Sequence, residues 1–180
     1  MSKAAIERSK KSQNGNPARD AFRSLIRVSG LLDTIMQSYF SRFGISRSQW
    51  GVLRNLYRAE GEGLSGLRPA DLGNRLLVRP PSVTGLLDRL ERLGYVRRNE
   101  HAVDLRGKEV RLTASGRSVV ERILPGHPAQ IASVMQGLEV KEQKQLHALL
   151  QRLATHLETR IEGQGEVEEG MLPAGSPVTQ

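Results

Sequence analysis

The stretch VTGLLDRLERLGYV, residues 83–96, decides the fold of this chain. Apolar side chains recur in it at steps of three and four, as they do on one face of a helix: Val83, Leu86, Leu87, Leu90 and Leu93. Gly94 supplies the residue type at which such a helix ends. A shorter helix that starts at Pro69 is predicted before it, and the two helices are joined by the turn Leu77-Val78-Arg79. A short helix, a tight turn and a second helix are typical of a helix-turn-helix.

Directly after Gly94 the period of the apolar residues changes from helical to two. Residues 95–98 and 109–112 both alternate in this way and predict two strands. The polar segment 99–108 between them predicts a hairpin with a long loop. A hairpin in this position after a helix-turn-helix is a wing.

Helical patterns flank this module on both sides. Further helices are predicted over about residues 20–43, 46–59, 113–124, 131–135 and 139–161. Ser46 and Gln49 match a capping box at the start of the second of these. The glycines of residues 61–66 match G-x-G-x-x-G, but a helix precedes them where a dinucleotide site needs a strand, so they predict a loop.

Charge is unevenly distributed along the chain, which has 27 Lys and Arg against 19 Asp and Glu, a net charge of +8. Residues 1–18 form a basic segment that we expect to be a flexible arm, and residues 163–180 form an acidic, glycine-containing segment that we expect to be disordered. Residues 1–20 carry a net charge of +3 and residues 161–180 carry −4. Residues 21–160 between them therefore carry +9. A body this basic predicts a polyanionic partner, nucleic acid or an anionic membrane surface, with solubility alone as the alternative.

Several classes of site are disfavoured by the composition. The chain has no Cys, which excludes disulfides and thiolate metal ligands. His147 and His156 are nine residues apart and lack ligand spacing, so we expect no metal or other cofactor, and histidines that lie on the surface or at an interface. There is no apolar run of about 20 residues and no signal sequence at the start, which predicts a cytoplasmic protein without a membrane partner.

Three sequence blocks resemble the MarR family of bacterial transcription regulators. The family pattern is roughly V-T-x-x-x-D-x-L-E-x-x-G-x-V-x-R, then D-x-R, then V-x-L-T-x-x-G. Here the first block begins at Val83 and ends at Arg98, the second is Asp104-Leu105-Arg106, and the third begins at Val110 and ends at Gly116. The blocks occur in order, and the resemblance covers about residues 20–160.

The resemblance implies a mainly α fold with a small β-wing (α+β), in one domain over residues 19–162. Its DNA-binding lobe would span about residues 46–113, and helices over about 20–43 and 114–162 would form a homodimer. The implied function is a sequence-specific DNA-binding regulator. We expect a homodimeric repressor of near-palindromic operators in double-stranded DNA, released by a small effector, for which an aromatic anion is the candidate. A transcriptional activator and a ligand-independent DNA-binding protein of the same fold stay open as alternatives.

Candidate DNA contacts come from the recognition helix and the wing. Arg106 is the strongest, because a lone Arg on a hairpin tip can enter a narrow minor groove, and Asp104 is placed to hold its guanidinium. The competing interpretation is a solvated surface pair. The groove-facing set of the recognition helix is Ser82, Thr84, Gly85 and Arg89. For Arg89 the alternative is an ion pair with Asp88 or Glu91. Expected phosphate clamps are Arg79, Arg97, Arg98 and Lys108, which could instead serve solubility.

A candidate effector site lies where the first helices meet the DNA-binding lobe. Members of the family often bind small aromatic acids there, and an apolar wall with a nearby Arg suits such an anion. The residues concerned are Met36, Phe40, Arg42, Trp50 and Arg54. Ordinary core packing is the simpler interpretation of the apolar members.

Two other functional classes compete with DNA binding. An enzyme would need a catalytic constellation, and neither a Ser-His-Asp set nor a pair of carboxylates is visible, so we expect no enzyme. A membrane-surface protein would need helices with a basic polar face, whereas the terminal helices carry both signs of charge.

Overall fold

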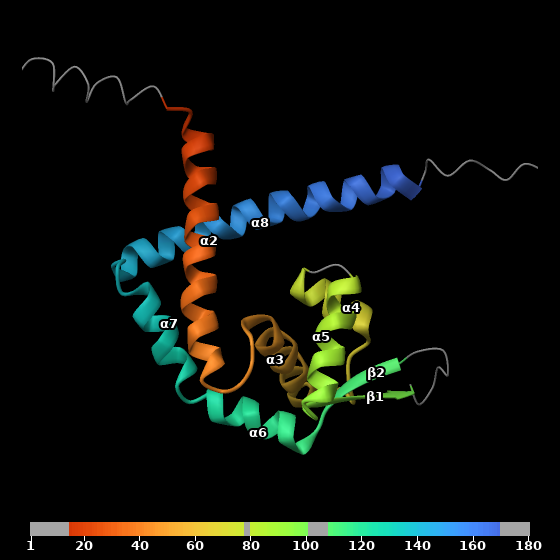
Figure 1. Cartoon of the computed structure of the whole chain (residues 1–180). Helices are drawn as coiled ribbons and strands as arrows, with labels where there is room; N and C mark the ends of the chain where they lie inside the picture. Colours follow the sequence, from red (N-terminus) through yellow and green to blue (C-terminus); the bar gives the residue numbers. More distant parts are fainter. Residues whose placement is uncertain (1–14, 78–79, 101–107, 170–180) are drawn as a thin grey trace, which may run out of the picture. The chain divides into compact units, whose positions relative to one another are not determined.

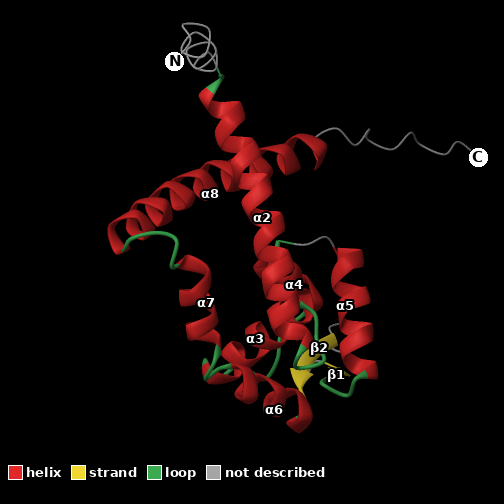
Figure 2. Ribbon diagram, turned by 60° about the vertical axis from the view of Figure 1, so that its left-hand side comes forward, coloured by secondary structure: helices red, strands yellow, loops and turns green. Residues whose placement is uncertain are grey.

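The computed structural model describes residues 15–77, 80–100 and 108–169, and within them the chain is mainly helical with one small antiparallel sheet. Figures 1 and 2 show the order of the elements. They are α2 (Pro17–Ser41), α3 (Arg47–Gly61), α4 (Pro69–Leu76), α5 (Pro80–Arg92), β1 (Val96–Glu100), β2 (Lys108–Leu112), α6 (Ala114–Ile123), α7 (His127–Met135) and α8 (Val140–Glu169). The predicted α+β class is confirmed.

The chain divides into two compact units at Gln130. The first unit holds α2 to α6 and the hairpin, and the second holds the end of α7 and all of α8. In the second unit the amide of Gln143 donates hydrogen bonds to the carbonyls of Met135 and Leu138. Glu142 accepts from the backbone of Glu139 and so caps the start of α8.

The core of the first unit is built around α3, which contacts α2, α4, α5, α6 and β2. The start of α3 is set by the predicted capping box, in which Ser46 accepts from the Gln49 amide and Gln49 accepts from that of Ser46. Both apolar neighbours of the box, Ile45 and Trp50, are buried. The fully buried residues of α3 to α5 include Leu53, Leu56, Leu72, Leu87 and Leu90.

The helix-turn-helix is formed by α4 and α5. Leu77 ends α4 in the left-handed conformation, with φ 52° and ψ 42°. A leucine rarely adopts this conformation, because its Cβ crowds the backbone there. α5 begins with two prolines, which fit a first turn because its amides have no partner inside the helix.

The hairpin pairs Val96 with Leu112 and Arg98 with Val110. Residues directly opposite in an antiparallel pair lie on the same face, and Val96, Val110 and Leu112 are buried. This face, which includes Arg98, is therefore the inner face of the hairpin. Leu67 joins the outer edge of β2 through two backbone hydrogen bonds with Val110.

The third sequence block joins α5 to α6. The hydroxyl of Thr113 accepts from the Gly116 amide, which caps α6, and donates to the carbonyl of Gly94. A Cβ on Gly116 would lie 2.0 Å from the carbonyl oxygen of Tyr95, so only glycine fits there. Gly94 itself has φ 71°, the left-handed value expected at the end of a helix.

Three boundaries differ from the sequence-based expectation: α7 begins at His127 and not at about residue 131, and both the arm and the tail contain helical residues. α2 begins at Pro17, inside the segment assigned to the arm, because the Asn16 side chain accepts from the amides of Ala18 and Arg19 and caps the helix. α8 continues to Glu169, so residues 163–169 of the expected disordered tail are helical. Gly163 and Gly165 weaken a helix without ending it.

Candidate nucleic-acid interface

The recognition helix α5 has three faces, which follow from its residue spacing. Val83, Leu87 and Leu90 are buried in the core of the first unit. Ser82, Gly85 and Arg89, at spacings of three and four, lie on a second face, which we name the reading face. Thr84, Asp88 and Glu91 lie on a third, which we name the tie face.

The reading face is available to a ligand. The side chains of Ser82 and Arg89 are exposed. Within the part of the chain that the structure describes, Arg89 forms no side-chain hydrogen bond or ion pair, so its expected alternative partners, Asp88 and Glu91, do not hold it. Gly85 has no atom within 4 Å of where a Cβ would stand, so the surface is open at its centre.

The tie face is occupied by Arg98 of the wing. Its Nη2 lies 2.5 Å from the Asp88 carboxylate and 3.5 Å from the carbonyl of Thr84, and its Nη1 lies 3.1 Å from the Glu91 carboxylate. The backbone amide of Arg98 also donates to Glu91. The side chain of Arg98 is only 26% exposed. Arg98 was expected to clamp a DNA phosphate, and the structure instead shows it paired with the carboxylates of the recognition helix.

Arg97 differs from its neighbour because side chains alternate along a strand. Arg98 shares the inner face of the hairpin with buried Val96, whereas Arg97 lies on the outer face and is exposed. Arg97 is opposite Arg111, whose guanidinium pairs with Glu109 at 2.9 Å. Arg97 thus stays a candidate phosphate contact.

The other predicted DNA contacts lie partly or wholly outside the described residues. Arg79, Asp104 and Arg106 are outside them, and Lys108 is described only as a backbone position in β2. Thr84 is exposed, as expected, but its spacing places it on the tie face.

The expected effector residues form an aromatic cluster rather than an open wall. The rings of Phe40 and Trp50 stack at 5.3 Å and are 1% and 5% exposed, so they are core residues. Met36 packs against the same core. Arg42 and Arg54 are exposed, and their guanidiniums lie over the rings of Tyr39 and Trp50 at 4.8 and 5.9 Å.

His127, which is half-buried, completes the aromatic cluster. Its ring lies 5.2 Å from that of Trp50, 5.7 Å from that of Phe40 and 6.0 Å from that of Tyr39. Its Nδ1 is buried and has no hydrogen-bond partner among the described residues. Burial lowers the pKa of His127, and the positive charge of Arg54 lowers it further. No sequence spacing indicates these contacts, because His127 lies far along the chain from the rings it meets.

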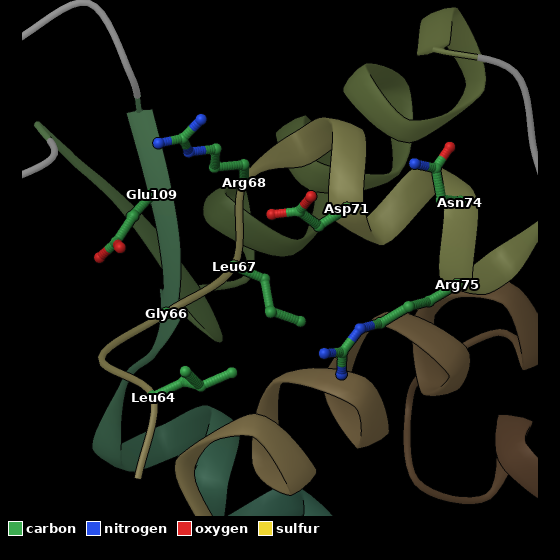
Figure 3. A pocket seen from close by; sticks show the side chains of 8 residues that line it. All are labelled: Leu64, Gly66, Leu67, Arg68, Asp71, Asn74, Arg75 and Glu109. Atoms are coloured by element: carbon green, nitrogen blue, oxygen red, sulfur yellow. The ribbon is translucent and has the colours of Figure 1, made fainter. Parts of the chain in front are cut away.

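A cleft of about 380 Å³ on the DNA-binding lobe was not anticipated from the sequence. Figure 3 shows Arg68, Asp71, Asn74 and Arg75 of α4 and its cap lining it, with Leu64, Gly66, Leu67 and Glu109 on the other sides. The exposed side chains of Arg68 and Arg75 have no ion pair within the described part of the chain. Two unpaired guanidiniums beside a cleft suit an anionic group.

Other kinds of site are not visible in the described residues. No group of three or more His, Asp or Glu side chains there could hold a metal ion. Among the same residues, no helix has both the length and the apolar character to cross a membrane.

Comparison with known proteins identifies the family. A model described as MarR family matches residues 43–107. The HTH-type transcriptional repressor YetL of Bacillus subtilis (strain 168) is 34% identical over 139 residues, which cover 75% of this chain and 81% of YetL.

Solved structures show the same fold. AbsC, a MarR family transcriptional regulator from Streptomyces coelicolor, is similar with a TM-score of 0.72 at 24% identity, over 81% of this chain and 97% of AbsC. Sco3205, a MarR family regulator from the same organism solved in complex with DNA, has a TM-score of 0.68 at 26% identity, over 77% of this chain and 86% of Sco3205. The winged helix-turn-helix, the three sequence blocks and these relatives agree, and the chain belongs to the MarR family of transcriptional regulators.

Proposed function

We propose that this protein is a homodimeric repressor that binds near-palindromic operators in double-stranded DNA in the cytoplasm. The observation that carries the proposal is the reading face of α5. Ser82 and Arg89 are exposed there, and no described residue pairs with the Arg89 guanidinium, while another face of the helix is buried in the core. A recognition helix reads base edges in the major groove, and Arg can bind guanine through two hydrogen bonds.

Backbone contacts would supply most of the affinity. Arg97 on the wing and Arg68 and Arg75 at the cleft are exposed cations on the same unit as α5. Lys and Arg side chains at phosphates fix the register of a protein on DNA and make binding depend on salt. Arg106 and Asp104, outside the described residues, keep their proposed role at the minor groove.

The proposed dimer explains the apolar surfaces of the long helices. On α2, Phe22 is 63% exposed, and Ile26, Leu31 and Ile35 are exposed as well. On α8 the exposed apolar residues follow helical spacing: Leu146, Leu149, Leu150, Leu153, Leu157 and Ile161. Apolar stripes of this length occur where a second surface covers them. A second copy is the occupant that also pairs two recognition helices for a two-fold operator.

The proposed effector would act at the aromatic cluster. The exposed guanidiniums of Arg42 and Arg54 flank the rings of Tyr39 and Trp50, an arrangement that suits an aromatic anion. Because Phe40 and Trp50 are core residues, such a ligand would enter only if this part of the core opened. Thermal melting and gel shifts with hydroxybenzoate, compared in wild type and Arg54→Ala, test this part of the proposal.

DNA binding is tested by footprinting the purified protein on genomic fragments that include its own upstream region. We expect a protected site with two-fold symmetry, and complexes that weaken as salt rises but outlast random competitor DNA. Protection without symmetry would contradict the dimer. Equal binding to operator and random DNA would contradict sequence-specific repression, and increased transcription on binding would favour the activator.

A further inference from the structure

We propose that Arg98 is a positioning residue that fixes the recognition helix against the wing and cancels negative charge on that helix, and that it does not bind a DNA phosphate. This inference rests on the proposed DNA binding. It concerns how the two reading elements of one lobe are held together.

The contacts of Arg98 connect two elements that reach DNA at different places. Three side-chain contacts run from Arg98 on β1 to Thr84, Asp88 and Glu91 on α5, and the Arg98 amide adds a fourth. These three residues span about two turns of the helix and reach its last turn. Both views of the lobe show α5 alongside the hairpin (Figures 1 and 2). Since the guanidinium is rigid and planar, bonds to several points on one helix fix the angle between helix and strand.

The charges at this contact argue against a phosphate clamp. The carboxylates of Asp88 and Glu91 already share the Arg98 guanidinium. A phosphate could take the cation only by leaving these carboxylates unpaired beside DNA. Arg97, the next residue, is exposed on the other face of the strand and has no ion pair within the described residues. It is the cation that can meet a phosphate at no such cost.

A fixed angle matters for specific binding more than for nonspecific binding. Contacts to base edges require the helix to enter the groove in one orientation, while the wing must reach its own groove at the same time. Attraction to random DNA is electrostatic and tolerates many orientations. Loss of the Arg98 tie should therefore lower affinity for the operator much more than affinity for random DNA, which loses only the effect of one positive charge.

The test compares Arg98→Ala with Arg97→Ala, a matched control that removes the same charge from the adjacent residue. Affinities for the footprinted operator and for random DNA are measured over a range of salt, and thermal melting checks that each variant is folded. For Arg98→Ala we expect a loss on the operator that exceeds the loss on random DNA by about tenfold. For Arg97→Ala we expect similar losses on both DNAs and a salt slope reduced by about one.

A triple variant separates positioning from charge. In Arg98→Ala with Asp88→Asn and Glu91→Gln, the helix has lost two negative charges and the tie together. We expect it to stay as weak on the operator as Arg98→Ala, although it is more positive than wild type. Glu91→Gln alone, which keeps an amide in place of the carboxylate, serves if Arg98→Ala melts below the assay temperature, and it should lower the ratio of operator to random affinity.

Two results would overturn the inference. Equal losses on both DNAs for Arg98→Ala would make Arg98 a phosphate contact, and full operator affinity in the triple variant would reduce its role to charge cancellation. Neither result affects the proposed operator binding, which fails if the wild-type protein does not prefer an operator over random DNA.

Discussion

The hydroxyl of Thr113 lies 2.6 Å from the carbonyl oxygen of Gly94, and this hydrogen bond joins the start of α6 to the end of the recognition helix. Beside it, the Tyr95 carbonyl leaves no room for a side chain on Gly116. The Thr and Gly of the Leu-Thr-x-x-Gly motif thus pack the start of α6 closely against the residues that follow α5.

Gly116→Ala should destabilise the protein by more than about 2 kcal/mol, because the new methyl group would displace the Tyr95 backbone. Gly85→Ala is the matched control: nothing lies within 4 Å of its Cβ, and alanine favours a helix over glycine by up to about 1 kcal/mol. Urea unfolding measures both changes. A stable Gly116→Ala protein would contradict the packing argument, and weaker operator binding by Gly85→Ala would support its place on the reading face.

A fall in pH should lower the stability of the first unit, because His127 becomes protonated. Its pKa is lowered in the folded state, so the unfolded chain binds more protons as the pH falls below 6.5. The stability that the neutral ring provides is therefore present above pH 6.5 and is lost as pH falls toward the folded-state pKa. His127→Phe keeps an aromatic ring against Phe40 and Trp50 and should flatten this dependence, measured by urea unfolding between about pH 7.5 and about pH 5. His156→Phe, on the exposed surface of α8, should leave it in place.

The wing-tip prediction concerns Arg106 and Asp104. Arg106→Ala should weaken operator binding by about 1–3 kcal/mol, most on operators with A·T-rich flanks, where the minor groove is narrow. Asp104→Ala should also weaken it, although a negative charge is removed, because the carboxylate is proposed to orient Arg106. Gel shifts decide the sign, and tighter binding by a folded Asp104→Ala protein would contradict the proposed role.

Leu153→Glu should produce monomers, since it places a charge in the apolar stripe of α8. Thr155→Glu adds the same charge on the opposite side of the helix and should leave the dimer intact. Truncation after Pro128 should likewise give monomers or aggregates that bind half-sites singly, whereas deletion of residues 170–180 should preserve the dimer. Light scattering measures the molecular mass of each variant. A dimeric Leu153→Glu protein would show that α8 is not part of the dimer interface.

The cleft on α4 offers a further test. Arg68→Ala with Arg75→Ala should lower affinity for operator and random DNA by the same factor, as expected for phosphate contacts. Arg58→Ala with Arg47→Ala removes two exposed cations from α3, both already paired with carboxylates, and should have a smaller effect. If the pairs behave alike, the cleft has no special part in DNA binding.

The periodicities of the apolar residues were sufficient to predict the order of the helices and strands. The cap at Ser46 and the change of period after Gly94 depend on neighbouring residues, and both predictions are confirmed. The end of the last helix was predicted too early, at about residue 161. Glycine only weakens a helix, and α8 continues through Gly163 to Glu169.

Side-chain partners were harder to predict than elements. Strand alternation could have separated Arg97 from Arg98, because buried Val96 marks the inner face. The contacts of His127 with Tyr39 and Trp50 join three helices and have no local signal in the sequence. The cleft likewise combines α4 with β2 and a loop, and only the fold brings them together.

The separation of faces on α5 affects how this lobe could acquire new operators. Among the described residues, the side chains of Ser82 and Arg89 take no part in the contacts that hold the helix to the wing. Both side chains can therefore be exchanged while the scaffold keeps its geometry. Base preference and architecture are encoded in different residues of one helix, so target choice can diverge among duplicated copies, or be redesigned, without rebuilding the protein.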